Sequence, residues 1–318
     1  MPKISVVIPL YNKGPYIERA LRSVQSQTIQ EFEIVVVDDG STDRGADVVE
    51  GFEDPRIRLI QQTNMGAVLA RNRGIREAEA DFIAFLDADD EWKPRFLETL
   101  IRLFDRYPEA GIFCTSFITA RPDGKTGGPR QGIVPPPPWE GLIPSYFLSA
   151  ALGGPSPSAS SAGVTKEVLA EFDGFSSGSW YGEDVDLWGR IALKYPIAFS
   201  WYTGAVYHED ALNRACSQKK PLREHPFLKT VQEEIRRGSV PEELLPDLME
   251  YVAALKIQVA ARNICMDEPA MAKPFLDDCE TKLLHRQKLF WQICAQFPPS
   301  VFMILRRMSR IMGWSVVS

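Results

Sequence analysis

Three carboxylates lie within four residues in the segment 86–90 (LDADD), which contains Asp87, Asp89 and Asp90. The apolar run before them predicts a buried strand, and carboxylates this close repel one another unless their charge is compensated. A hard divalent cation would compensate it, because Mg²⁺ and Mn²⁺ prefer carboxylate and phosphate oxygens. The alternative is a polar turn whose aspartate caps the helix predicted after Pro94. The spacing alone leaves both interpretations open.

A second acidic group, the segment 38–41 (DDGS), follows another apolar run. Asp39 is placed to accept hydrogen bonds from a nucleotide base or ribose. The alternative is ordinary turn chemistry, with Ser41 capping the next helix.

The third acidic group is the segment 182–188 (GEDVDLW). Leu187 and Trp188 are expected to anchor a helix that begins near Glu183 and Asp184. A carboxylate held rigidly beside a cleft can act as a general base. The alternative is an acidic helix N-terminus that complements the helix dipole.

His208 and Arg214 are further candidates near the end of the predicted α/β region. A neutral imidazole is a good metal ligand, so His208 is a candidate ligand; a satisfied structural histidine is the alternative. Arg214 lies in a polar stretch and fits a loop that closes over phosphates, or a solvated loop.

These groups depend on alternating strand and helix patterns. Residues 4–10, 32–38, 57–60 and 82–86 predict buried strands, and helical periodicity lies between and after them. Repeated strand–helix–strand units predict an α/β fold with a mostly parallel sheet flanked by helices. Ligands bind beyond the carboxyl ends of such strands, where the first two acidic groups fall.

Composition excludes several classes of protein. The chain has 318 residues and a formal net charge of −6, which argues against a general nucleic-acid binder. Its five cysteines are an odd number without a Cys-x-x-Cys pair, so we expect neither a zinc site nor a disulfide framework. No stretch has the length of a spanning helix or a signal-peptide core. We therefore expect a cytoplasmic protein, or one on the inner face of the cell membrane.

The pattern changes twice along the chain. Residues 121–138 are rich in glycine and proline and predict a loop or disordered insertion. Beyond about residue 220 only helical patterns occur, so we divide the chain into an α/β domain, 1–215, and a helical C-terminal region, 216–318. A predicted helix within 299–318 has an apolar face and a basic face. That pattern fits a membrane surface, this chain's own domain, or a second subunit in a homodimer.

The order of these pieces resembles glycosyltransferase family 2, whose members have the GT-A fold. The resemblance rests on residues 6–12 (VVIPLYN), 36–43 (VVDDGSTD), 64–66 (NMG) with 70–75 (ARNRGI), 85–90 (FLDADD) and 182–188 (GEDVDLW). Each piece is weak alone, but five in sequence order are a specific signal. The resemblance spans residues 4 to about 208, roughly two thirds of the chain.

The resemblance implies roles for individual residues. Pro9, Tyr11 and Asp39 would line the nucleotide pocket, Arg71 would approach the base or neighbouring groups, and Asp87 would contact the ribose and sugar side. Asp89, with His208 as the further candidate, would hold Mn²⁺ or Mg²⁺ on the diphosphate. Asp184 would be the catalytic base, and Glu183 would position the acceptor.

The implied activity is inverting, metal-dependent transfer of a hexosyl group from a nucleotide-diphosphate-sugar, by family habit a UDP-sugar. The acceptor would be a hydroxyl of a saccharide or lipid-linked molecule, in cell-surface polysaccharide or glycolipid synthesis. Two alternatives are a sugar-phosphate nucleotidyltransferase and a non-catalytic nucleotide-sugar-binding protein. A nucleotidyltransferase would need a Gly- and Arg-rich loop after the first strand, where this chain has residues 9–14 (PLYNKG). A non-catalytic protein would be expected to lack a carboxylate at 89 or 184, and both are present.

Overall fold

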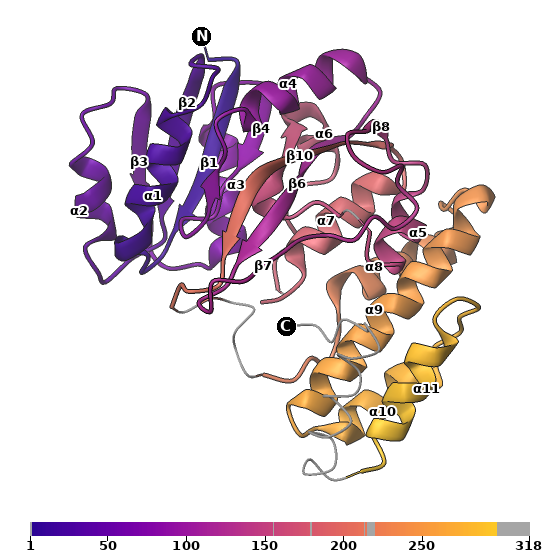
Figure 1. Cartoon of the computed structure of the whole chain (residues 1–318). Helices are drawn as coiled ribbons and strands as arrows, with labels where there is room; N and C mark the ends of the chain where they lie inside the picture. The colour runs from indigo at the N-terminus through magenta and orange to yellow at the C-terminus, as the bar shows by residue number, and fades with distance from the viewer. Residues whose placement is uncertain (1, 155, 179, 213, 215–219, 298–318) are drawn as a thin grey trace.

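The computed structural model describes residues 2–154, 156–178, 180–212, 214 and 220–297 (Figure 1). In these residues one sheet collects the strands β1 (Ile4–Leu10), β2 (Phe32–Asp38), β3 (Ile57–Gln61), β4 (Phe82–Phe85), β5 (Glu91–Trp92), β6 (Ile112–Ala120), β7 (Thr126–Gly127), β8 (Glu140–Leu142), β9 (Ala162–Thr165) and β10 (Ile197–His208). The helices are α1 (Gly14–Gln25), α2 (Gly45–Glu50), α3 (Ala67–Glu77), α4 (Phe96–Arg106), α5 (Tyr146–Ala151), α6 (Lys166–Glu171), α7 (Glu183–Ala192), α8 (Pro226–Arg237), α9 (Leu245–Cys265), α10 (Pro269–Asp277) and α11 (His285–Cys294).

The sheet has the strand order β3-β2-β1-β4-β9-β6-β10-β5, with β7 beside β6 and β8 beside β10. The strands from β3 to β4 are parallel, as the sequence predicts. Beyond them the sheet is mixed, because β9 runs antiparallel to both β4 and β6. The α/β class is confirmed. The parallel half aligns the carboxyl ends of β1, β2 and β4, so the loops that follow them meet at one edge.

Helices cover both faces of the sheet because β1 and β2 bury side chains on both sides. Ile4, Val6 and Ile8 of β1 pack into a core cluster with α1, α2 and α4. Val7, between them, points to the other face and joins a cluster with α3, α5 and α7. This alternation follows from the two-residue period of a strand.

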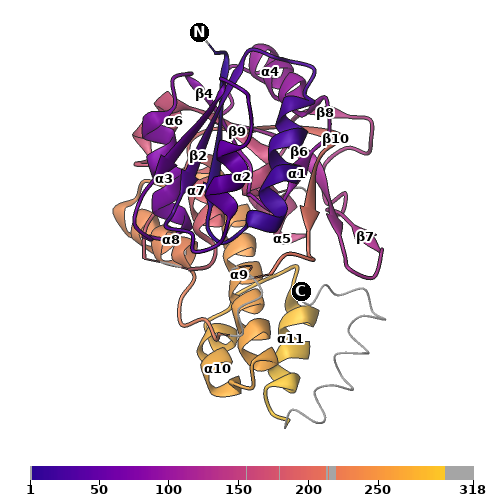
Figure 2. The same ribbon diagram turned by 90° about the vertical axis from the view of Figure 1, so that its left-hand side faces the viewer.

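The helical C-terminal region extends away from the sheet (Figures 1 and 2). Its longest helix, α9, belongs to two clusters. Leu248, Tyr251 and Leu255 pack with α5, α7 and α8 against the sheet. Ala260 and Ile264, farther along, pack with α10 and α11. One continuous helix therefore connects the α/β core with the last two helices.

The proposed division at residue 215 stays a prediction, since residues 215–219 lie outside the described residues. The amphipathic stretch 299–318 also lies outside them. Among the helices that the structure describes, none is long and apolar enough to cross a membrane.

Two local predictions need comment. The helix cap predicted at Ser41 is wrong: α2 begins at Gly45, after Arg44. The Ser41 hydroxyl instead accepts a hydrogen bond from the Asn12 amide at 3.0 Å. This bond connects the loops after β1 and β2. The segment 121–138 is largely irregular but contains the short strand β7, and Trp201 Nε1 donates to the Pro135 carbonyl at 2.7 Å.

Candidate active site

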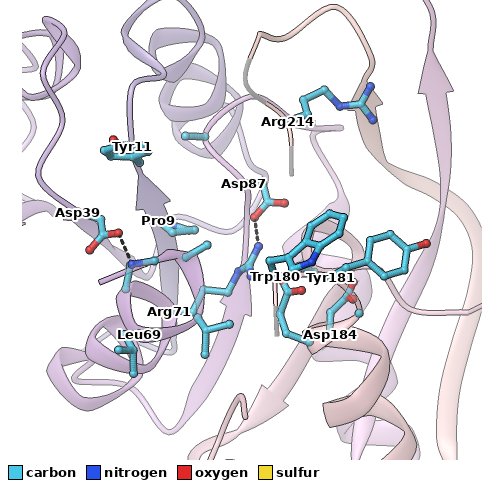
Figure 3. A pocket seen from close by; sticks show the side chains of 18 of the residues that line it. Pro9, Tyr11, Asp39, Leu69, Arg71, Asp87, Trp180, Tyr181, Asp184 and Arg214 are labelled. Atoms are coloured by element: carbon cyan, nitrogen blue, oxygen red, sulfur yellow. Dashed lines mark hydrogen bonds and ion pairs between the residues drawn. The ribbon is translucent and has the colours of Figure 1, made fainter. Parts of the chain in front are cut away.

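A cavity of about 1300 Å³ opens at the carboxyl edge of the sheet (Figure 3). Eight of the nine predicted site residues line it. They come from the ends of β1, β2 and β4, from α3, and from the start of α7: Pro9, Tyr11, Asp39, Arg71, Asp87, Asp89, Glu183 and Asp184. His208 is not among the lining residues. The fold therefore brings together segments separated by more than a hundred residues.

Asp39 is 1% exposed and directs its carboxylate into the loop after β3. Its Oδ1 accepts hydrogen bonds from Gln62 Nε2 at 2.7 Å and from the Met65 amide at 2.8 Å. Its Oδ2 accepts one from the Gly66 amide at 2.7 Å. These bonds hold residues 64–66 against the cavity, beside Pro9 and Tyr11. Oδ1 already accepts two hydrogen bonds, whereas Oδ2 accepts one and keeps a lone pair for a ligand, because each ionised oxygen can accept about two hydrogen bonds.

Arg71 connects β4 to α7. Its Nη2 lies 2.6 Å from Asp87 Oδ1, and its Nη1 lies 3.0 Å from Glu183 Oε1. Burial alone would lower the pKa of the guanidinium, but the charges of Asp87 and Glu183 outweigh it and raise that pKa. Figure 3 shows Arg71 pointing toward Asp87. The guanidinium is thus engaged by two carboxylates and positions both.

The negative charge of Asp89 is balanced by a lysine that the sequence did not point to. Lys13 Nζ lies 2.7 Å from Asp89 Oδ2. Arg19 adds positive charge nearby, since its Nη2 donates a hydrogen bond to the Asp89 carbonyl. The charge of this carboxylate is therefore balanced within the protein.

Asp90 faces the interior instead of the cavity and is 1% exposed. It accepts hydrogen bonds from Ser160 Oγ at 2.6 Å and from the His208 amide at 3.1 Å. Burial raises the pKa of Asp90 well above its ordinary value, and the charges of Asp87 and Asp89 raise it further. Asp90 therefore fixes the loop after β4 to η1 (Ala159–Ser161) and to the end of β10.

The carboxylates at this edge of the sheet suit a divalent metal whose coordination is completed by a bound ligand. Asp87 and Asp89 both face the cavity. Among the residues that the structure describes, no group of three or more His, Cys, Asp or Glu side chains could form a cage. Mg²⁺ commonly takes one or two carboxylates together with substrate phosphates. These residues fit that arrangement, with most ligands supplied by water and a diphosphate.

His208 lies between other acidic groups. Its Nε2 is 3.9 Å from Glu91 Oε2, and its Nδ1 is 4.0 Å from Asp210 Oδ1. Burial, followed by the charge of Arg19, lowers the pKa of the imidazole and favours its neutral form. The ring does not join Asp89 in a ligand cluster, so its predicted metal role stays a prediction.

Arg214 lines the cavity, and its guanidinium lies 4.8 Å from the centre of the Tyr207 ring. Residues 213 and 215–219, on either side of it, lie outside the described residues. The closing loop predicted around Arg214 is therefore not described and stays a prediction.

The opposite wall begins at α7. Leu187 and Trp188 are fully buried, which confirms the predicted anchor. Asp184 lines the cavity, and burial raises its pKa to about 7, with the charge of Glu183 as the next cause. A carboxylate with a pKa near neutrality can accept a proton efficiently in this pH range.

Several lining residues that the sequence did not predict lie on this wall: Trp180, Tyr181, His225 and Gln258. The aromatic pair directly before the Gly182–Glu183 step was a usable signal. His225 and Gln258 gave none, because α8 and α9 reach the cavity only through tertiary packing. Gly182 shows how tight that packing is: its φ is +77°, and a Cβ there would lie 2.6 Å from His225 Nε2.

Known proteins are similar to this chain in sequence and in fold. The family model described as "Glycosyl transferase family 2" matches residues 5–169, more than half of the chain. An uncharacterized glycosyltransferase of Nostoc, alr2836, is 32% identical over 62% of this chain and 60% of its own length. The uncharacterized glycosyltransferase YibD of Escherichia coli is 43% identical over 32% of this chain and 30% of its own length. These matches thus cover less than two thirds of either relative.

A similar fold occurs in S. aureus TarS residues 1–349, solved in complex with UDP-GlcNAc. The TM-score is 0.70 and the identity 18%, over 98% of this chain and 92% of that one. Another crystal structure of that protein contains UDP and gives a TM-score of 0.56 at 20% identity.

Proposed function

Since this chain belongs to glycosyltransferase family 2, we propose that it is an inverting, metal-dependent enzyme that transfers a hexosyl group from a nucleotide-diphosphate-sugar to an acceptor hydroxyl. One observation carries the proposal: Asp184 lines the same cavity as the carboxylates of Asp87 and Asp89. Burial there raises the pKa of Asp184 to about 7. A proton acceptor thus stands beside groups that suit a diphosphate and its metal. The TarS complexes with UDP-GlcNAc and UDP support a UDP-sugar as the donor.

The donor would lie along the edge of the sheet. Pro9, Tyr11 and Asp39 would hold the nucleotide, with Asp39 accepting hydrogen bonds from the base. Asp87 would lie toward the ribose and sugar, and Asp89 would hold the divalent ion on the diphosphate, with His208 as a further candidate ligand. That ion would supply positive charge that balances the diphosphate as it leaves.

The reaction is a single displacement. The acceptor oxygen bonds to the anomeric carbon while the bond from that carbon to the diphosphate oxygen breaks. The bonding electrons leave with the nucleotide diphosphate, and the acceptor proton passes to Asp184. The configuration inverts because the acceptor attacks from the face opposite the leaving diphosphate, and one base on the acceptor side suffices for this single displacement. Glu183 positions the acceptor, and Arg71 holds Glu183 and Asp87 at 3.0 Å and 2.6 Å.

The proposed acceptor is a saccharide or a lipid-linked saccharide, used in cell-surface polysaccharide or glycolipid synthesis. Trp180 and Tyr181 support this class because they line the cavity directly before Glu183. Aromatic faces offer an apolar surface to the C–H side of a sugar ring, while the ring edges keep polar contacts. The proposed place of action is the cytoplasm or the inner face of the membrane.

A donor-hydrolysis screen tests the function. Purified protein is incubated with a panel of nucleotide-sugars, with Mn²⁺, Mg²⁺ or EDTA, and released nucleoside diphosphate and free sugar are measured. The proposal expects at least one nucleotide-sugar to be cleaved, with loss of activity in EDTA. Pyrophosphate-dependent formation of nucleoside triphosphate would instead indicate a nucleotidyltransferase. Tight nucleotide-sugar binding without turnover, with or without candidate saccharide acceptors, would indicate a binding protein.

A further inference from the structure

Lys13 is the last residue of the loop between β1 and α1 and has no role in the function proposed above. Its ammonium is 2.7 Å from Asp89 Oδ2, and the two side chains are only 12% and 14% exposed. The same ammonium donates a hydrogen bond to the Leu212 carbonyl at 2.7 Å. A largely buried ion pair of this kind is screened much less by salt than a surface pair.

The position of this ammonium conflicts with a metal on Asp89. A divalent ion bound to the carboxylate would sit within a few ångströms of the ammonium, and like charges at that distance repel strongly. Arg19, whose Nη2 donates to the Asp89 carbonyl, adds to the positive potential. A metal can therefore bind Asp89 well only after Lys13 moves, and lysine has a flexible stem that allows this movement.

Lys13 also connects Asp89 to the segment after β10. The Leu212 carbonyl accepts from Lys13, and the Leu212 amide donates to Tyr16 Oη at 3.1 Å. Arg214, two residues farther, lines the cavity. Any movement of Lys13 therefore changes its contacts with both Asp89 and Leu212.

We propose that Lys13 is the resident cation of Asp89 in the donor-free protein, and that it gives up this carboxylate when metal and diphosphate arrive together. The inference rests on the proposed function. Lys13 disfavours metal binding in the absence of nucleotide. When the diphosphate is present, the displaced ammonium has a new anionic partner, since lysine binds phosphate as a point charge. Metal and nucleotide consequently bind with positive cooperativity, and each raises the affinity of the other by the same factor.

The test measures Mn²⁺ affinity by electron paramagnetic resonance of free Mn²⁺, first without and then with UDP. Lys13→Met removes the charge and keeps most of the side-chain length. Without UDP, this variant should bind Mn²⁺ about tenfold more tightly than the wild type, or better, because a competing charge is gone. The gain in Mn²⁺ affinity on adding UDP should be smaller in the variant than in the wild type.

Three controls accompany the test. Lys13→Arg keeps the charge and should stay close to the wild type. Lys3→Met removes an exposed lysine that pairs with Glu31 at 3.2 Å, and it should change nothing. Asp89→Asn in the Lys13→Met background should abolish the gain and thereby locate the metal at Asp89. If Lys13→Met does not fold, Lys13→Gln replaces it.

Equal or weaker Mn²⁺ affinity in the folded neutral variant would overturn the proposal, and so would failure of every variant to bind Mn²⁺. The first result leaves the proposed function untouched, whereas the second would also count against its metal dependence. The hydrolysis screen judges glycosyl transfer itself separately. Hydrogen exchange provides a readout without metal. Lys13→Met removes the bond to the Leu212 carbonyl, so this residue should be held less firmly and its amide, which donates to Tyr16 Oη, should exchange faster. Unchanged exchange would contradict the link between Lys13 and the segment after β10.

Discussion

Three neighbouring aspartates at the end of β4 are accommodated in three different ways. Asp87 pairs with Arg71, and Asp89 pairs with Lys13. Asp90 is buried, and its pKa is raised while Ser160 and the His208 amide donate to it. The mutual repulsion expected from the sequence is therefore resolved without an ion. The proposed metal is favoured instead by Asp87 and Asp89, because both face the cavity and could share an ion with a bound diphosphate.

Asp184→Asn tests the proposed base. Asparagine preserves the size of the side chain but cannot accept the acceptor proton, so transfer should fall about 10²-fold or more. Donor binding, measured by calorimetry with a UDP-sugar, should change little. Asp186→Asn is the contrasting variant, because Asp186 bonds Ser176, Arg190 and Thr230 inside the protein. It should lower the thermal unfolding temperature. Near wild-type transfer in Asp184→Asn would rule out this base.

The pH dependence follows from the same residue. Burial, together with the charge of Glu183, raises the pKa of Asp184 to about 7, and the base works only when deprotonated. The rate should therefore fall by about tenfold per pH unit as the pH drops below about 7, and level off above it. Initial rates in overlapping buffers measure this fall in rate below about pH 7, the acidic limb of the pH profile. A rate that stays constant down to pH 5 would exclude a base with this pKa.

Arg71 should determine the pH at which this acidic limb of the rate profile lies. The charge of Arg71 lowers the pKa of Asp184, against the effects of burial and Glu183. Arg71→Met should therefore move the acidic limb to higher pH, whereas Arg71→Lys, which keeps the charge, should leave it near the wild-type position. A merely structural role would reduce the rate or the stability without moving the limb. Coincident pH profiles in wild type and Arg71→Met would thus contradict the positioning role.

At the scale of elements, α7 and α8 are joined by unusually close packing. A Cβ at Gly189 would lie 2.2 Å from Cε2 of Phe227, which is fully buried. Gly189→Ala should therefore destabilise the fold by about 1–3 kcal/mol through overpacking. Gly51→Ala is the matched control, since its backbone is helical and its nearest contact would be 3.4 Å. Denaturant unfolding compares the two; equal loss of stability would contradict the packing argument.

The elements differ in how far the sequence could predict them. The strands β1 and β2 were predictable because continuous β-branched runs are local signals of buried strands. The loops after them were predictable because ligands bind at that edge of a parallel sheet. The mixed half of the sheet was not, because the place of β9 between β4 and β6 depends on contacts distant in sequence. Lys13 was missed for a related reason: its partners, Asp89 and Leu212, are far along the chain.

In the whole molecule, α9 makes the helical region part of the cavity that we propose as the active site. Tyr251 and Leu255 pack into the core beside the sheet, and Gln258 lines the cavity. Its Nε2 donates to Tyr181 Oη at 3.4 Å, on the wall that also carries Asp184. The wall that we propose for the acceptor is therefore built partly by a helix outside the matched family segment, which ends at residue 169. This is why the family resemblance indicates a donor class more readily than an acceptor.

We propose that this cavity transfers a sugar by one displacement at the anomeric carbon. Proton NMR of the first free sugar released from an α-linked nucleotide-sugar tests it most directly, with the donor chosen by the hydrolysis screen and spectra taken before mutarotation. Asp184→Asn provides the control for non-enzymatic release. We expect the β anomer to appear first, because a single displacement inverts the configuration at the anomeric carbon. Initial release of the α anomer would contradict it.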